Sequence, residues 1–123
     1  KHLDEWNQRR RDHANTYLKG LSSLPLETLR IEKDAEPVWH IFPIRTEKGE
    51  EIREMLNKNL IETGVHYPVP VHKQPAYCQY NHQSLSVTEK VAEHIISLPM
   101  YPEIEGEEIK MICDIIAEEI SKL

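Results

Sequence analysis

The sequence predicts a small α/β domain (more closely α+β), in which helices cover a sheet of few strands. Three observations predict this class. Apolar residues recur every three or four positions in several stretches, which is the pattern of amphipathic helices. The run 38–44 is almost continuously apolar and rich in β-branched and aromatic residues, which is typical of a buried strand. The chain has 123 residues, enough for one domain, 1–123, with a core of its own.

Composition and charge exclude several classes of function. Hydrophobic residues make up 39% and charged residues 29% of the chain, as in an ordinary globular domain. The net charge of −6 argues against nucleic acid as a partner, because phosphate contacts need a basic face. No apolar stretch approaches the roughly 20 residues of a membrane span, and we find no signal peptide. The single cysteine pair, Cys78 and Cys113, is too few for a disulfide scaffold, so we expect reduced thiols and a cytoplasmic protein.

The first element is an amphipathic helix over residues 1–21. Gly20 lies near its end, and Pro25 prevents much extension beyond it. The pattern begins at the start of the chain without a capping residue, so we expect further sequence upstream. The connection 22–36 is polar and predicts at most one short strand, near Leu29 and Ile31. The apolar positions of the helix are Leu3, Trp6, Ala14, Tyr17, Leu18 and Leu21.

The middle of the chain predicts a strand, a helix and a second strand. We expect the run 38–44 to be buried on both faces, with Pro43 at a sheet edge or a bulge because proline cannot donate to a ladder. Within it, His40 is better interpreted as a hydrogen-bonded core histidine than as a ligand. A helix follows over about 48–59, and residues 61–65 form a plausible short strand that ends in a turn at Gly64.

Two helices close the chain. Ser86 and Glu89 have the S-x-x-E spacing of a capping box, and Pro99 ends the helix that starts there. Acidic residues at 105, 107 and 108 favour the positive end of the last helix. Cys113 lies in the apolar stripe of that helix, which indicates core packing. The two predicted apolar faces are Val87, Val91, Ala92, Ile95 and Ile96, and then Ile109, Ile112, Cys113, Ile116, Ile120 and Leu123.

Residues 66–82 do not fit a scaffold. Prolines at 68, 70 and 75 exclude a helix, and no alternation supports a strand. Loops longer than about 12–15 residues are uncommon in compact domains and are usually functional or disordered. Because this one carries three tyrosines, we interpret it as a rigid, extended loop packed on another surface. Its imidazole and phenol groups suit a polar ligand such as a sugar.

Other chemistry for this loop is weaker. His66, His72, His82 and Cys78 are possible zinc ligands by type, but their spacings match no compact zinc motif, so we predict no metal site. Cys78 with His72 or His82 has the residue types of a nucleophile and its base, but nothing orients such a pair. The four glycines form no phosphate-binding motif. The residues alone therefore predict no complete active site.

Five ordered motifs carry a resemblance to a known family. They are residues 3–10 (LDEWNQRR) with Ala14 and Tyr17, residues 39–45 (WHIFPIR), residues 61–72 (IETGVHYPVPVH) continued by 74–77 (QPAY), Thr88-Glu89, and residues 97–102 (SLPMYP). Together they resemble the C-terminal small domain of the DegT/DnrJ/StrS-type nucleotide-sugar aminotransferases. These are pyridoxal-phosphate enzymes with the aspartate-aminotransferase fold.

The resemblance implies a reaction and its partners. Such enzymes transfer an amino group, usually from glutamate, to a nucleotide-linked keto sugar in polysaccharide, lipopolysaccharide or antibiotic-sugar biosynthesis. A lysine forms a Schiff base with the cofactor and an aspartate holds the pyridine nitrogen, both in a large domain upstream. No lysine of this chain lies in such a context, so we expect a fragment without activity or catalytic residues of its own. The resemblance further implies a homodimer, and a helix over 1–21 that joins the two domains.

The resemblance also assigns substrate contacts. It places the loop 66–82 at the mouth of the active site, with His66 as the best candidate to contact the sugar or its phosphates. Tyr67 and His72 are weaker candidates, and Gln74 and Tyr77 weaker still. For His66 the alternative is a structural hydrogen bond that holds the loop.

Two other functions stay open at this point. One is a stand-alone, non-catalytic binding module with the same fold. The other is part of a related dehydratase, since some relatives replace the Schiff-base lysine and eliminate water.

Overall fold

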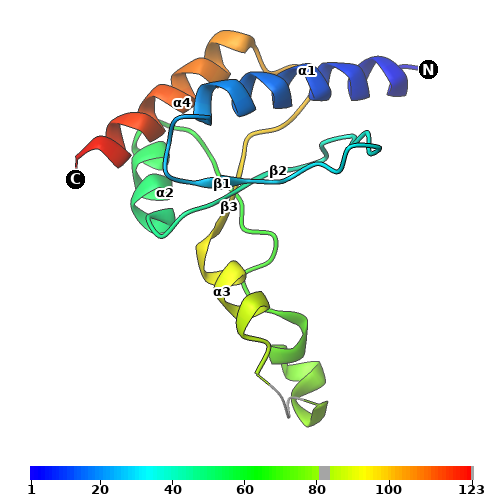
Figure 1. The fold of residues 1–123 in the computed structure, drawn as a ribbon, viewed down its shortest axis with the longest axis vertical. Coiled ribbons are helices and arrows are strands. Elements are labelled where there is room, and N and C mark those ends of the chain that lie inside the picture. The colour runs from blue at the N-terminus through cyan, green and yellow to red at the C-terminus, as the bar shows by residue number, and fades with distance from the viewer. Residues whose placement is uncertain (81–83, 123) are drawn as a thin grey trace.

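The computed structural model describes residues 1–80 and 84–122, and the side chains of Cys78 and Tyr80 are outside the described part. His82, from the predicted loop, and Leu123, from the predicted stripe, are also outside it. The small α/β class is confirmed, with a three-stranded antiparallel sheet in the order β1-β2-β3 (Figure 1). The elements are α1 (Leu3–Leu21), β1 (Glu27–Thr28), β2 (Phe42–Arg45), α2 (Gly49–Lys58), the 3₁₀ helices η1 (Val71–Lys73) and η2 (Pro75–Tyr80), α3 (Ser86–His94), β3 (Ile95–Leu98) and α4 (Gly106–Ser121).

The core lies between the sheet and the helices α1, α2 and α4. Figure 1 shows α1 and α4 side by side along one side of the sheet, with α2 next to α4. Tyr17 of α1 is fully buried; its ring stacks on Phe42 with centroids 4.7 Å apart, and its hydroxyl donates to the carbonyl of Pro99 at 3.0 Å. Burial raises the pKa of Tyr17. This one side chain therefore ties α1 to the sheet.

Helices α1 and α4 are in tight contact at Gly20. A Cβ atom at this position would lie 2.7 Å from the Sγ of Cys113, closer than real contacts allow. The absence of a side chain at Gly20 therefore lets the two helices meet. Cys113 is buried, as its place in the stripe predicted, and burial, followed by the charge of Asp114, raises the pKa of its thiol to about 11.

The strand predicted over 38–44 is shorter than expected. Trp39 has a φ of 51°, in the left-handed region, and this interrupts the extended backbone before β2 begins at Phe42. The Trp39 ring is nevertheless buried and stacks on Phe42, whereas His40 is exposed. The expectation of a core histidine at 40 is therefore wrong. Within β2, Phe42 and Ile44 are buried while Pro43 and Arg45 are half-buried, so the strand is not equally buried on both faces.

Pro43 lies in the central strand, not in an edge strand. Opposite it, the backbone N–H and C=O of Ser97 pair with Gly64, at 2.8 and 3.0 Å, and so point away from β2. The Pro43–Ser97 pair is therefore one that needs no donated hydrogen bond from proline. On the other side, β1 pairs only with Ile44 and Arg45. Proline is tolerated because the ladder requires nothing from its nitrogen.

Residues 61–65 do not form the predicted strand, and the short strand expected near Leu29 and Ile31 lies instead at β1. Of the segment 61–65, only Gly64 pairs, as an isolated bridge to Ser97. The preceding helix α2 ends with Leu60 at a φ of 61°, where the N–H groups of Leu60 and Ile61 donate back to the carbonyls of Asn57 and Leu56. This is the Schellman ending, which normally has glycine at this position.

The boundary between α3 and β3 also differs from the prediction. We expected Ile95 and Ile96 on a helical face, but α3 ends at His94 and both isoleucines belong to β3. The backbone of β3 finds partners on both sides, β2 on one and Gly64 on the other. This pairing favours the extended form, to which β-branched side chains are suited.

Residues 66–80 and 84–94 form an arm, and the rest of the described chain forms a body. The arm contains η1, η2 and α3 and projects away from the sheet (Figure 1). The 3₁₀ turns correct the expectation of a fully extended loop, since prolines at 70 and 75 can begin short helices. No residue of α3 is buried. In the part of the chain that the structure describes, we find no helix with the length and apolar character needed to cross a membrane.

Candidate functional site

His66 begins the arm and lies against the sheet. Its Nδ1 is 3.0 Å from the Oγ of Ser97, a buried residue in β3, although the imidazole itself belongs to an exposed residue. The backbone of Ser97 is at the same time paired with Gly64. The contact occupies Nδ1 and leaves Nε2 as the ring nitrogen for an external partner.

Gly64 provides the space for this imidazole. A Cβ atom at Gly64 would lie 2.7 Å from the Cε1 of His66 and 3.3 Å from its Nδ1. Any larger residue would therefore push the ring from its position on Ser97. The G-V-H order of the sequence thus has a local reason: the glycine pairs with the sheet and admits the histidine ring.

A cavity of about 200 Å³ opens beside His66. Its wall combines imidazole, carboxylate and hydroxyl groups with apolar side chains. Ligand sites usually measure about 300–1,000 Å³, so this cavity is too small to enclose a large ligand by itself. Its lining residues are His40, Ile41, Glu62, Gly64, His66, Ser97, Leu98, Pro99 and Met100.

The five residues assigned by the resemblance do not converge on this cavity, since only His66 lines it. Tyr67 is 74% exposed and meets the edge of the His66 ring, with centroids 5.6 Å apart. Gln74 is half-buried between η1 and η2, and Tyr77 in η2 is 45% exposed. Tyr67 and Tyr77 therefore present aromatic surface to the outside of the arm.

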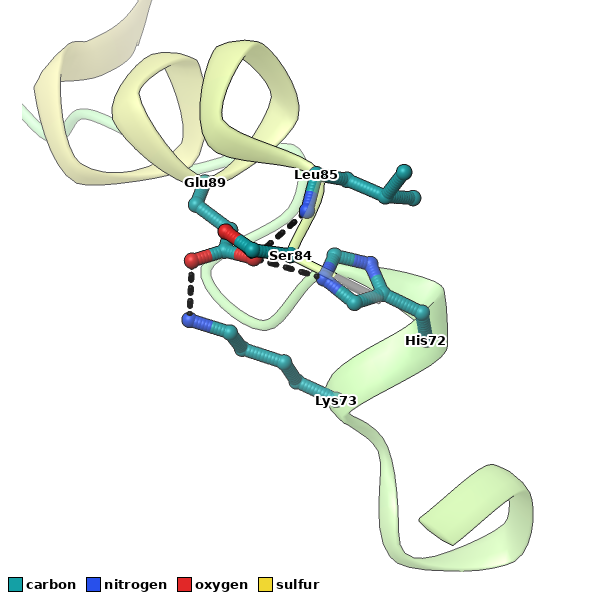
Figure 2. Close-up of polar contacts among 5 residues, drawn as sticks. All are labelled: His72, Lys73, Ser84, Leu85 and Glu89. Carbon is teal, nitrogen blue, oxygen red and sulfur yellow. Dashed lines mark hydrogen bonds and ion pairs between the residues drawn. The ribbon is translucent and has the colours of Figure 1, made fainter. Parts of the chain in front are cut away.

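His72 has a different environment, at the start of α3. Its Nε2 lies 3.1 Å from Oε1 of Glu89, and the side chains of both residues keep only 15% and 20% of their surface exposed. The other carboxylate oxygen accepts a hydrogen bond from Nζ of Lys73 at 2.7 Å. Figure 2 shows the Glu89 carboxylate between these two side chains of η1. We call these three residues the Glu89 clasp.

The backbone at the start of α3 also donates to the Glu89 carboxylate of the clasp. The N–H of Leu85 donates to Oε1 of Glu89 at 2.9 Å, and Ser84 Oγ lies 3.5 Å from the same oxygen (Figure 2). The predicted capping box is therefore wrong, because the cap is Leu85 and not Ser86, and no side chain caps the helix. The hydrogen bond from Lys73, then those from His72 and Leu85, lower the pKa of Glu89 from 4.5 to about 2.

Sequence reasoning missed several residues of these two places. The prediction placed Ser97 at the end of the helix that Pro99 stops, and His40 in the core. Lys73 had no assigned role. The S-x-x-E spacing did single out Glu89, but for a local helix cap, since no pattern in one sequence shows contacts between a loop and a helix 16 residues later.

No lysine of this chain is buried. Every lysine is exposed or half-buried, and several are engaged with carboxylates at the surface, as Lys73 is with Glu89. An amine that forms a Schiff base requires a shielded position that perturbs its pKa. Among residues 1–80 and 84–122, no three His, Cys, Asp or Glu side chains lie close enough together to hold a metal ion.

Comparison with known proteins identifies the family. The model of the DegT/DnrJ/EryC1/StrS aminotransferase family matches residues 1–117. The chain belongs to this family. One relative, the dTDP-3-amino-3,4,6-trideoxy-alpha-D-glucose transaminase of Streptomyces venezuelae, is 42% identical over 120 residues, which are 95% of this chain and 32% of the relative.

Solved structures share the fold. DesV of S. venezuelae, in complex with a ketimine intermediate, superposes with a TM-score of 0.93 at 38% identity, over 99% of this chain and 34% of that one. NtdA of Bacillus subtilis, with bound cofactor PMP, gives a TM-score of 0.82 at 29% identity, over 94% and 28%. This chain therefore spans about a third of the length of the relatives that it matches.

Proposed function

We propose that this chain is the small, C-terminal domain of a pyridoxal-phosphate-dependent aminotransferase that acts on a nucleotide-linked keto sugar. The observation that carries the proposal is the match to DesV, at a TM-score of 0.93 over 99% of this chain. The sugar transaminase named above supports the substrate class, at 42% identity. The PMP bound to NtdA supports the cofactor.

In this proposal the chain supplies one wall of the substrate site. Nε2 of His66 is the polar atom best placed to contact a sugar hydroxyl or a phosphate oxygen, because Nδ1 is engaged by Ser97. Tyr67 adds an exposed ring that suits the face of a sugar or a base. His72, Gln74 and Tyr77 lie further along the arm and act on the nucleotide part, directly or by shaping the loop.

The rest of the reaction requires partners. A large domain upstream supplies the groups that hold the cofactor, since no lysine here is shielded enough to do so. Helix α1 joins the two domains. We further propose that glutamate is the amino donor, and that the enzyme is a homodimer that works in the cytoplasm.

The activity of the full-length protein tests the proposal directly. It is incubated with pyridoxal phosphate, glutamate and a panel of nucleotide-linked keto sugars, and amino-sugar formation is followed by mass spectrometry together with 2-oxoglutarate release. We expect amination of at least one sugar. Loss of water from the sugar without nitrogen gain would indicate a dehydratase. A protein with neither activity nor cofactor binding would indicate a binding module.

Variants at two positions separate binding from loop support. His66→Ala should reduce turnover of the nucleotide sugar while cofactor absorbance is retained. Ser97→Ala removes the Oγ contact but leaves the imidazole, so it should have the smaller effect if His66 binds substrate. Equal effects of both variants would indicate that the imidazole only holds the loop. His94→Ala on α3, away from the cavity, is the matched control.

A further inference from the structure

The arm has little to hold it in place besides polar contacts. No residue of α3 is buried, and η1 has three residues, too few for a stable helix. Apolar side chains of the arm such as Val71 and Val87 are 64% and 76% exposed. None of the arm's side chains that the structure describes is fully buried, so specific bonds matter most for the position of the loop relative to α3.

Glu89 makes most of those bonds with one carboxylate. Its Oε2 accepts from Lys73, while Oε1 lies at hydrogen-bond distance from His72 and accepts from the N–H of Leu85. Lys73 and His72 belong to η1, and Leu85 caps α3. The carboxylate thus joins two segments that the chain separates by η2 and by residues 81–83. Its pKa of about 2 keeps it charged across the physiological range.

The loop segment between His66 and Lys73 is anchored at both ends. At one end His66 contacts Ser97 of the sheet at 3.0 Å, and at the other His72 contacts Glu89 at 3.1 Å. Pro68 and Pro70 lie between the anchors and restrict the backbone there. A stiff segment with two fixed ends has one defined path, whereas the same segment with one free end can swing about the other.

From this geometry we infer that Glu89 is a positioning residue for the substrate site: by clasping His72 and Lys73 to the start of α3 it sets the path of residues 66–73 and so the placement of His66 and Tyr67. The structural half of this inference, that Glu89 orders the loop, is independent of the reaction. The functional half rests on the proposed function. Glu89 touches neither cofactor nor substrate in this role and acts through the loop.

The test uses the full-length protein with Glu89→Ala, and hydrogen exchange of peptides that cover residues 66–80. We expect exchange in these peptides to rise roughly ten- to a hundredfold, as expected when charge-assisted hydrogen bonds to a carboxylate are lost. Peptides from α1 and α4 should exchange as in the wild type. Glu93→Gln removes an exposed carboxylate one turn further along α3 and is the control for charge. It should leave exchange unchanged both in the peptides of residues 66–80 and in those of α1 and α4. Unchanged exchange in Glu89→Ala would overturn the inference.

Kinetics with the same variants test the functional half. Glu89→Ala should raise the KM for the nucleotide sugar about tenfold, while the half-reaction with the amino donor stays within about twofold, because that half-reaction does not use the loop. Lys73→Ala should raise the KM for the nucleotide sugar by less than Glu89→Ala does. Lys73→Arg should keep the wild-type KM, since arginine can also donate to Oε2 of Glu89. Equal losses in both half-reactions would show a general structural role and overturn the assignment.

The two halves fail in distinguishable ways. If the wild-type protein aminates no nucleotide sugar, the proposed function fails, and the exchange experiment still decides whether Glu89 orders the loop. If the wild type is active and Glu89→Ala exchanges faster but keeps its KM, the loop is ordered by Glu89 without consequence for substrate, and the positioning role is overturned.

Discussion

The body and the arm of this domain are held by different forces. In the body, sixteen apolar side chains are buried in one cluster, among them Tyr17, Phe42 and Ile116, which are completely buried. In the arm, no residue of α3 is fully buried, and among the described contacts the carboxylate of Glu89 joins α3 to η1. Burial in a close-packed core fixes many positions at once, whereas hydrogen bonds fix only the atoms that they join. The body is therefore suited to be a scaffold, and the arm to carry groups whose placement one bond can alter.

The largest loss of stability is expected from a substitution in the core of the body. Phe42→Ala removes a ring that stacks on both Tyr17 and Trp39 in a site with no exposed surface. We expect the free energy of unfolding to fall by about 3–5 kcal/mol. The matched change in the arm, Val87→Ala at a 76% exposed position, should cost less than about 0.5 kcal/mol. Denaturant titration of both variants checks this, and similar losses would contradict the comparison.

A smaller effect is expected at the contact between α1 and α4. Gly20→Ala gains about 1 kcal/mol of helix propensity, but its Cβ would meet the Sγ of Cys113 at 2.7 Å. Overpacking of this kind costs about 1–3 kcal/mol, so we expect a net loss near 1 kcal/mol in denaturant titration. The double variant Gly20→Ala, Cys113→Ala should be more stable than the two separate losses predict, because the 2.7 Å contact with Sγ is gone and only the 3.1 Å contact with the Cβ of residue 113 remains. A stabilising Gly20→Ala would show that the helices can move apart freely.

A substitution at Leu60 should stabilise the domain. Its φ of 61° is costly for a residue with a Cβ atom and ordinary for glycine, and its side chain is 94% exposed. Leu60→Gly should therefore raise the free energy of unfolding by about 0.5–1 kcal/mol. Leu60→Ala keeps the Cβ atom and should show no such gain. Thermal unfolding of the three proteins separates backbone strain from loss of the side chain.

Acid should loosen the arm and leave the body intact over a defined range. The pKa of Glu89 is about 2 in the folded protein and 4.5 for an unperturbed glutamate, so the charged carboxylate favours the clasp above pH 4.5. This contribution declines as the pH falls below 4.5 and is gone below about 2. We expect protection of residues 66–80 in hydrogen exchange, corrected for intrinsic rates, to decline over that range. Glu89→Gln should lack this dependence.

The prediction from sequence was best where one local pattern and one physical cause coincide. Helices α1, α2 and α4 lie where apolar residues recur at helical spacing, because burying one face of a helix needs little knowledge of the partner. The prediction was wrong at Ile95 and Ile96. Their spacing fits the apolar face of a helix, but their β-branched side chains fit a strand equally well, and the strand is what forms. The arm was recognised as exceptional from its prolines, histidines and tyrosines, but its 3₁₀ turns were not.

The candidate site divides in the same way. His66 was selected by residue type and by resemblance, and the structure adds its bond to Ser97 and the space left by Gly64. The roles of Tyr67, His72, Gln74 and Tyr77 in binding stay predictions. Lys73 was missed because its partner Glu89 lies 16 residues away, and Glu62 and His40 were missed because the cavity that they line forms only when residues 97–100 fold beside them.

By itself the sequence determined the class of fold, most of the helices, the family resemblance and the exceptional character of the loop 66–82, because these follow from the residue types and spacings within short windows. Only the tertiary structure decided that Ile95–Leu98 is a strand, that Trp39 breaks the run before β2, and that Glu89 joins η1 to α3. The physical reason is that a backbone or a charge takes the state in which its hydrogen bonds are satisfied, and the partners in these cases are brought near only by folding.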